Sequence, residues 1–267
     1  MRKLLFGSSG SRWLKRIVPQ ADRTLEAADL INVSNASDVR TLARHGHRPD
    51  KIVVFPFGLF PERSAAFRPT AEVIAAPAKI AFLGSFDPRK GMVDLPRIAS
   101  RVIGKLPGVV FKLIGTAGMI STAEGVLTCF SRNVRPNVQV IPRFEPDELP
   151  ELLADCTAAV FPSRVEGFPF GVLEMLAAGL PVMAYDVPGP PMMLPPEFLV
   201  PRGDAAALAD KLLKLLADRN RLIDVRRWAR RRSLDFGWDE TIGQTARSYR
   251  QRLAARHSPA QPAPSPV

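Results

Sequence analysis

Two carboxylates, Glu166 and Glu174, lie eight residues apart, with the glycines Gly167 and Gly171 between them. Glycine has no Cβ, so the main chain at these positions can approach a ligand closely. A helix expected over residues 172–178 begins just after this loop, and the free N–H groups at a helix start attract phosphate. The pattern favours one ligand between the carboxylates, with its hydroxyls on the carboxylates and its phosphates on the amides. The plainer interpretation is an exposed loop charge at Glu166 and, at Glu174 in the first helical turn, an acid favoured by the helix dipole.

A second loop, GSFDPRKGM at residues 84–92, joins an expected strand at 80–83 to an expected helix. Backbone N–H groups at a helix start bind anions, and Arg89 and Lys90 would add two positive charges at the same place. The alternative is an ordinary strand-to-helix turn with solvated charges. The dinucleotide pattern GxGxxG and the phosphate-loop pattern GxxxxGK[ST] do not occur in the sequence, so a dinucleotide site is not expected.

Both loops need strands and helices to position them. Short apolar or β-branched runs alternate with helical patterns along most of the chain, which is typical of an α/β fold with a parallel sheet. Helices are expected at residues 38–44 between a Ser37 cap and a Gly46 stop, at 147–154, and at 205–217 after an Asp204 cap. The expected strands span residues 30–33, 52–55, 80–83, 109–114, 138–141, 158–161, 182–185 and 198–200.

A further helix, expected at residues 222–234, is rich in arginine. The expected basic face is made by Arg226, Arg227, Arg230, Arg231 and Arg232. A solvated cationic face is the simpler interpretation, and contact with an anionic membrane or a phosphate is the other. The last helix is expected at 238–253, followed by a Pro-rich disordered tail.

The amino-acid composition limits the classes of molecule that the protein is expected to bind. The chain has 37 Lys and Arg against 26 Asp and Glu, a net charge of +11 and a sequence pI near 10.3, which favours anionic partners. Aromatic residues make up 7% of the chain and are not interleaved with the basic ones, so nucleic acid is not expected as a partner.

Two cysteines, Cys129 and Cys156, without zinc-type spacing argue against a disulfide framework or a metal site. The apolar run at residues 4–6 is too short for an export signal, and no run approaches a membrane span. We therefore expect a cytoplasmic protein, with at most peripheral contact at the inner membrane face.

The segment at residues 158–189 resembles the Glu-x7-Glu motif of retaining glycosyltransferases of the GT-B fold, glycosyltransferase family 4 (group 1) in particular. Glu166-Gly167-Phe168 opens the motif, Leu173-Glu174 closes it, and AAGLPV at residues 177–182 is similar to its usual continuation. FLGSFDPRKGM at residues 82–92 resembles the family's donor-diphosphate loop. FGWDETIGQTARSYRQRL at residues 236–253 resembles its closing helix, and the whole resemblance covers about residues 24–253.

The resemblance implies a Rossmann-like parallel sheet flanked by helices, as in the GT-B C-terminal domain, and transfer of a sugar from a nucleotide-sugar donor with retention of configuration. By the same resemblance, Arg89 and Lys90 would neutralise the diphosphate, Glu174 would hold the ribose hydroxyls, and Glu166 would hold the donor sugar. Arg89, Lys90 and Glu166 are thus the expected catalytic group. The other expected donor-binding residues are Gly84, Ser85, Gly115, Phe144, Gly167, Phe168, Pro169, Phe170, Gly171 and Val172. The nucleotide sugar is a substrate, and neither a cofactor nor a metal is expected.

The sequence departs from the family pattern in three places. Ser85 stands where a basic residue is often found, and Pro56-Phe57-Gly58-Leu59 replaces the usual Pro-Asn-Gly-aliphatic hinge. The third departure is that most of the N-terminal acceptor domain is missing. We expect residues 1–66 to be a remnant of that domain with the hinge, 67–78 a linker, 79–236 the nucleotide-sugar-binding domain, 237–254 a crossover helix and 255–267 a disordered tail.

Three hypotheses for function stay open. The favoured one is a glycosyltransferase that needs a missing, separately encoded N-terminal half. The second is a catalytically inactive nucleotide-sugar-binding or regulatory module. The third is a basic protein that binds anionic membranes or nucleic acid through the arginine-rich helix.

Overall fold

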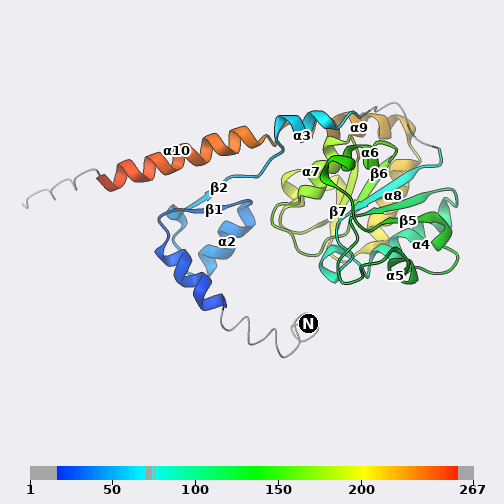
Figure 1. Cartoon of the computed structure of the whole chain (residues 1–267), viewed down its shortest axis with the longest axis horizontal. Helices are drawn as coiled ribbons and strands as arrows, with labels where there is room; N and C mark the ends of the chain where they lie inside the picture. The colour runs from blue at the N-terminus through cyan, green and yellow to red at the C-terminus, as the bar shows by residue number, and fades with distance from the viewer. Residues whose placement is uncertain (1–16, 70–73, 75, 258–267) are drawn as a thin grey trace, which may run out of the picture. The chain divides into compact units, whose positions relative to one another are not determined.

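The computed structural model describes residues 17–69, 74 and 76–257 (Figure 1). Within them the chain forms two compact units, one that ends at Phe55 and resumes at Thr241, and one that spans Pro56–Glu240. Residues 70–73 and 75 of the expected linker, and residues 258–267 of the expected tail, lie outside the described residues. Residues 255–257 continue the last helix, so the expected start of the tail at 255 was too early.

The larger unit is built on a six-stranded sheet in which every neighbouring pair is parallel, with the strand order β5-β4-β3-β6-β7-β8. The strands are β3 (Lys79–Leu83), β4 (Val110–Ile114), β5 (Val138–Ile141), β6 (Ala158–Phe161), β7 (Val182–Asp186) and β8 (Leu199–Pro201). From β3 the chain proceeds to β4 and β5 on one side, and β6 returns to pair with the other edge of β3. The expected α/β fold with a parallel sheet is confirmed.

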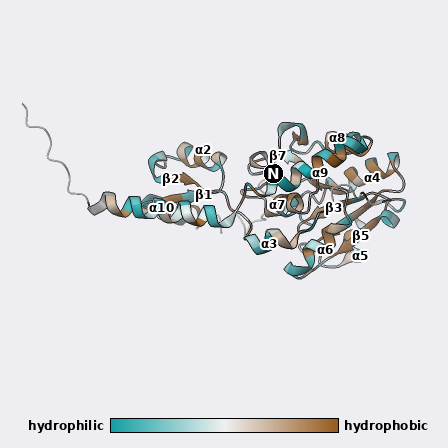
Figure 2. Ribbon diagram, turned by 90° about the horizontal axis from the view of Figure 1, so that it is seen from above, coloured by the Kyte–Doolittle hydropathy of each residue, from teal (hydrophilic) through white to brown (hydrophobic). Residues whose placement is uncertain are grey.

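Helices cover both faces of this sheet (Figure 1). Alternate residues of a strand point to opposite faces, so β3 contributes Ile80 and Phe82 to one hydrophobic core and Ala81 and Leu83 to the other. The first core is closed by α4 (Leu95–Lys105), α8 (Ala205–Leu216) and part of α9 (Arg219–Ser233). The second is closed by α6 (Leu149–Ala154) and α7 (Phe170–Ala177). Figure 2 shows hydrophilic and hydrophobic residues alternating along α8, as expected of a helix with one buried face.

The remaining elements of the larger unit are short. They are α3 (Pro61–Ala66), α5 (Ala123–Thr128), and the 3-10 helices at Pro88–Lys90, Arg135–Asn137, Pro146–Glu148, Pro190–Met192 and Pro196–Phe198. The expected helix at 147–154 is therefore a 3-10 turn followed by α6.

Helix boundaries follow their capping residues. Asp204 caps α8 by accepting a hydrogen bond from the backbone N–H of Ala207 at 2.9 Å, as expected. In α2 (Ala36–Arg44) the cap is Asn35, whose side chain accepts from Asp38, so the expected Ser37 cap was wrong. Helix α7 begins at Phe170, two residues before the expected start, and Glu174 therefore lies in its second turn rather than its first.

The arginine-rich helix, α9, does not present the expected basic face. Arg226 is 2% exposed, and its guanidinium donates to the backbone carbonyls of Cys156 and Thr157 at 3.0 and 2.8 Å. Arg230 and Arg232 also donate to backbone carbonyls of neighbouring segments. Arg226 falls on the apolar stripe of the helix, four residues after Leu222 and three before Ala229, and so the fold buries it.

The smaller unit contains a helix at residues 17–27, α2, a 3-10 turn at Pro49–Lys51 and the part of α10 (Trp238–His257) that follows Thr241. Its two strands, β1 (Ile31–Val33) and β2 (Ile52–Val54), pair in parallel with Ile31 opposite Ile52. Across the described ranges, none of the helices combines the length and apolar character needed to cross a bilayer.

Candidate functional site

The two candidate loops meet where the strand order reverses. One loop follows β3 and the other follows β6, and these strands are hydrogen-bonded neighbours although the chain continues from them in opposite directions across the sheet. In open parallel sheets, ligands bind outside the carboxyl ends of the strands at such a reversal. The topology thus places residues 84–92 and 162–174 side by side at the carboxyl ends of the strands.

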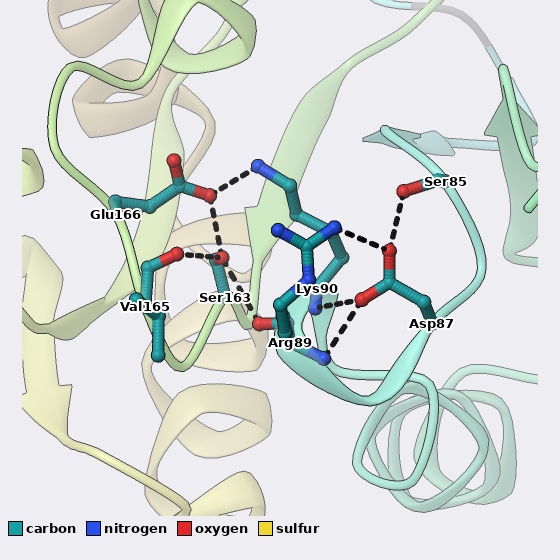
Figure 3. Close-up of polar contacts among 7 residues, drawn as sticks. All are labelled: Ser85, Asp87, Arg89, Lys90, Ser163, Val165 and Glu166. Carbon is teal, nitrogen blue, oxygen red and sulfur yellow. Dashed lines mark hydrogen bonds and ion pairs between the residues drawn. The ribbon is translucent and has the colours of Figure 1, made fainter. Parts of the chain in front are cut away.

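Asp87 organises the first loop (Figure 3). Its carboxylate accepts from the backbone N–H groups of Arg89 and Lys90 at 2.8 and 3.2 Å and from the Ser85 hydroxyl at 2.7 Å. Burial would raise the pKa of Asp87, but the Ser85 and backbone hydrogen bonds hold it below its ordinary value. Because two of the expected anion-binding amides already bond to Asp87, this loop offers a ligand the side chains of Arg89 and Lys90 instead.

Lys90 and Glu166 join the two loops. The Lys90 ammonium donates to Glu166 Oε1, and the Ser163 hydroxyl donates to the same oxygen at 2.5 Å (Figure 3). The Glu166 side chain is 8% exposed and the Lys90 side chain 26%. Arg89 lies beside them with its side chain 61% exposed, and its guanidinium contacts Asp87 at 3.2 Å. The three residues expected to form the catalytic group therefore lie together, with Glu166 covered and Arg89 open to solvent.

Glu174 has a different partner. Its carboxylate accepts from the guanidinium of Arg63 at 3.1 Å, and Arg63 also donates to the Pro146 carbonyl at 2.6 Å. Both side chains of the Glu174–Arg63 pair are 20% exposed. Burial raises the pKa of Glu174, and the pairing with Arg63 opposes that rise. No sequence pattern indicated Arg63 as a partner, because Arg63 lies in α3, 111 residues before Glu174.

The start of α7 packs tightly against β3. A Cβ added at Gly171 would stand 3.4 Å from the Leu83 carbonyl oxygen, and Val172 is fully buried. The N–H groups of Val172 and Leu173 donate to the Pro169 carbonyl. Gly167 lies close to Gly189, where an added Cβ would stand 2.7 Å from the Gly167 carbonyl oxygen.

Phe168 and Phe170 belong to an aromatic cluster with two residues distant in the chain. The Phe57 ring lies edge-on to Phe168 at 5.4 Å, is stacked on Phe170 at 5.7 Å and lies edge-on to Trp238 at 5.5 Å between ring centroids. Phe57, which stands where the family's hinge usually has an asparagine, thus packs on the loop that carries Glu166.

Gly115 and Phe144, two more of the expected donor-binding residues, are in contact with each other. The Phe144 ring covers Gly115, where an added Cβ would stand 2.9 Å from Phe144 Cε1. The loop after β4 continues to Gly118, which lies against Ser85, with 3.1 Å between an added Cβ and the Ser85 Cβ. Gly84, which follows β3, donates from its N–H to the Ile114 carbonyl at 3.0 Å. These expected residues therefore border the first loop.

Sequence patterns missed four residues that support this site. Ser163 bonds to Glu166, Asp87 shapes the first loop, and Asp94 pairs with Arg164 across the two loops. An Asp followed by Pro, as in Asp87-Pro88, is a turn signal that would have indicated the role of Asp87. Within the described ranges, no group of three or more His, Cys, Asp or Glu side chains is arranged to hold a metal ion.

Comparisons with known proteins find relatives of this chain. The D-inositol 3-phosphate glycosyltransferase of Acidothermus cellulolyticus is 29% identical over 265 residues, covering 92% of this chain and 58% of that protein. The protein of the same name from Segniliparus rotundus is 26% identical over 250 residues, covering 90% of this chain and 56% of that one. This chain therefore spans somewhat more than half the length of these relatives.

Solved structures share the fold. Sucrose-phosphate synthase from Thermosynechococcus elongatus has a TM-score of 0.73 and 26% identity, over 86% of this chain and 60% of that one. Anabaena HepE, solved in complex with UDP-glucose, has a TM-score of 0.70 and 18% identity, over 84% and 64% of the two chains. These neighbours have the GT-B fold, and the larger unit matches it.

The sequence profile described as Glycosyl transferases group 1 matches residues 77–218, which is more than half of the chain and includes both loops. This protein belongs to the glycosyl transferases group 1 family.

Proposed function

We propose that the chain binds a nucleotide sugar at the two loops and is the donor-binding part of a glycosyltransferase that acts with retention of configuration. The observation that carries the proposal is the meeting of Lys90, Arg89 and Glu166 at the point where the sheet order reverses. A uridine diphosphate sugar is the first donor to test, because HepE of Anabaena was solved with UDP-glucose and the pneumococcal O-GlcNAc transferase with UDP and GlcNAc.

Charge supports this assignment. In the transfer, the bond between the anomeric carbon and the diphosphate oxygen breaks, and its electron pair stays on the diphosphate. Lys90 and Arg89 would stabilise the added negative charge, since fixed cations aimed at developing charge lower a reaction barrier. Each charge-assisted hydrogen bond is worth about 1.5–3 kcal/mol, or one to two powers of ten in affinity or rate.

The Lys90–Glu166 pair suggests how the site exchanges partners. With a diphosphate present, Lys90 would turn its ammonium from Glu166 to the phosphate oxygens, and Glu166 would then accept hydrogen bonds from the sugar hydroxyls. Glu174 keeps a charged partner in Arg63 and would accept from the ribose hydroxyls with its other oxygen. No metal enters this proposal, because the two cations supply the positive charge. Retention of configuration rests on the Glu-x7-Glu spacing between Glu166 and Glu174.

Titration calorimetry tests the binding step. We expect the wild-type chain to bind UDP and UDP-glucose, and Lys90→Met to weaken both by at least about tenfold. Lys105→Met is the matched control, because Lys105 lies in the last turn of α4 and away from both loops. Absence of binding at millimolar UDP, GDP and ADP and their glucose conjugates would overturn the proposal.

Catalysis is tested separately. Release of UDP from UDP-glucose, to water or to an added acceptor, should occur with the wild-type chain combined with the N-terminal half of a relative, and should fall in Lys90→Met. Binding without release of UDP in that combination would instead favour a nucleotide-sugar-binding module.

A further inference from the structure

A second ion pair connects the Glu166 loop to the start of α4, directly after the first loop. Asp94, at the start of α4, accepts hydrogen bonds on both carboxylate oxygens from the guanidinium of Arg164, at 2.9 Å each. Asp94 is fully buried, and the side chain of Arg164 is 33% exposed. The backbone N–H of Arg164 donates to the Arg89 carbonyl at 2.6 Å. Arg164 therefore holds the chain at Arg89, within the first loop, and at Asp94, just after it, which are positions before and after Lys90 in the sequence.

Asp94 is not used by its own helix. It occupies the N-cap position of α4, yet its side chain makes no capping hydrogen bond, and Pro96 at the second helical position has no N–H to offer. The Tyr185 hydroxyl is buried beside this carboxylate. Burial, and next the Asp94 carboxylate, raise the pKa of Tyr185, which therefore stays neutral. Instead of capping α4, the Asp94 carboxylate thus bonds to Arg164 through both of its oxygens.

We propose that Arg164 is the positioning residue that sets the first loop and the Glu166 loop in register. This inference rests on the proposed function of the site. Arg164 directly follows Ser163, whose hydroxyl bonds to Glu166, and its N–H bonds to the carbonyl of Arg89. Fixing its guanidinium therefore fixes the backbone on which both partners of the Lys90–Glu166 pair stand.

The chemistry of arginine suits this role. A guanidinium and a carboxylate joined by two parallel hydrogen bonds have a defined orientation as well as a defined distance. A lysine at position 164 would keep the charge but lose the fork, because an ammonium is a point charge on a flexible stem. A residue needed only to neutralise buried Asp94 would tolerate that change, and a residue that sets register would not.

The experiment compares two ion pairs of the same chemistry. The double variant Asp94→Asn with Arg164→Met removes the proposed pair without leaving an uncompensated buried charge. The double variant Asp210→Asn with Arg101→Met is the matched control, because Arg101 lies on the same helix and bonds both oxygens of Asp210 at 2.7 Å, away from the loops. We expect the first double variant to lose at least about tenfold in UDP affinity and the control to stay within about twofold.

Amide hydrogen exchange of the ligand-free protein gives a readout independent of binding. We expect residues 85–92 and 163–171 to exchange at least about tenfold faster in the loop variant than in the control, with the strands unchanged. Arg164→Lys should show the same two effects in smaller measure. It also serves as the comparison should the loop double variant not fold.

The positioning role is overturned if the double variant with Arg164→Met and the variant Arg164→Lys both bind UDP within twofold of the wild-type affinity. Amide exchange in the two loops would then also be unchanged. Loss of affinity and faster exchange in Arg164→Lys support it. If the wild-type chain binds none of the nucleotides, the proposed function fails, and the exchange comparison alone then decides the positioning role.

Discussion

The ammonium group of Lys90 lies against the carboxylate of Glu166, although 76 residues separate them in the chain. The pair forms because β3 and β6, which precede the two residues, are neighbours in the sheet. Its two members differ in access, with Glu166 nearly covered and Lys90 partly open. A diphosphate that approaches the site therefore competes with Glu166 for Lys90.

Glu166→Gln should release Lys90. The amide keeps the size of the side chain and an acceptor for Ser163 but removes the charge that holds the ammonium. We expect UDP to bind this variant as tightly as wild type, or up to about tenfold more tightly, whereas Lys90→Met weakens binding. Calorimetry at two salt concentrations measures both. A loss of UDP affinity in Glu166→Gln as large as that in Lys90→Met would contradict the competition.

Arg63→Met should make stability more dependent on pH. Burial raises the pKa of Glu174 above its unfolded value, and Arg63 limits the rise. A carboxyl with a raised folded pKa stabilises the fold below its unfolded pKa, and this contribution is lost as the pH rises through the folded pKa. Without Arg63 the loss grows, so we expect the unfolding free energy to fall by roughly 1–3 kcal/mol more at pH 7 than at pH 4. Urea unfolding at both pH values measures the difference.

The control for this prediction is Arg48→Met, because Arg48 pairs with Asp50 on the surface. Its effect on stability should be close to zero at both pH values. A deficit of Arg63→Met that is the same at pH 4 and pH 7 would show that only the contacts of Arg63 with Pro146 and Phe67 matter.

Arg226→Met should destabilise the larger unit by about 1–3 kcal/mol, because it leaves the buried carbonyls of Cys156 and Thr157 without this donor. Arg227→Met, one residue later and half exposed, should change the unfolding free energy by less than about 0.5 kcal/mol. Urea unfolding of both variants gives the comparison. Equal effects would restore the interpretation of α9 as a solvated basic face.

Gly91→Ala should be more harmful than Gly203→Ala. Both glycines have a positive φ, +93° and +91°, so each alanine costs about 1–2 kcal/mol of backbone strain. At Gly91 the new Cβ would also stand 2.4 Å from the Pro162 carbonyl oxygen, whereas at Gly203 the nearest atom is 3.5 Å away in the Arg164 side chain. We expect an additional loss of roughly 1–3 kcal/mol in Gly91→Ala, measured by urea unfolding. Equal losses of unfolding free energy in Gly91→Ala and Gly203→Ala would mean that the backbone near Gly91 rearranges to relieve the clash without a further loss of stability.

The strands were predictable because each is a short apolar run bounded by loop residues, and the predicted and observed ends agree to within about a residue. Periodicity identifies which residues face a core, but it does not reveal which strand lies beside which. The pairing of Lys90 with Glu166 depends on that order. The sequence patterns indicated that both residues belong to the site, but they did not indicate that the two side chains contact each other.

Three arginines were not predicted correctly from the sequence, for two different reasons. Arg226 was counted as surface because arginine is usually exposed, although its place on the apolar stripe of α9 indicated burial. Arg63 and Arg164 were not singled out because their partners lie 111 and 70 residues away. The contacts of Arg63 and Arg164 with such distant partners leave no local pattern in the sequence.

The adjacency of β3 and β6 also bears on how the protein is made. When a ribosome has completed β3, β4 and β5, one edge of β3 still has no neighbour, since β6 begins only at Ala158. Counted from the completion of β3 at Leu83, and at roughly 5–20 residues per second, that edge stays unpaired for about 4–15 seconds before β6 begins. Until β6 arrives, the backbone N–H and C=O groups along that edge of β3 are open to pairing with a strand of a second nascent chain, and the contact between the two site loops cannot form.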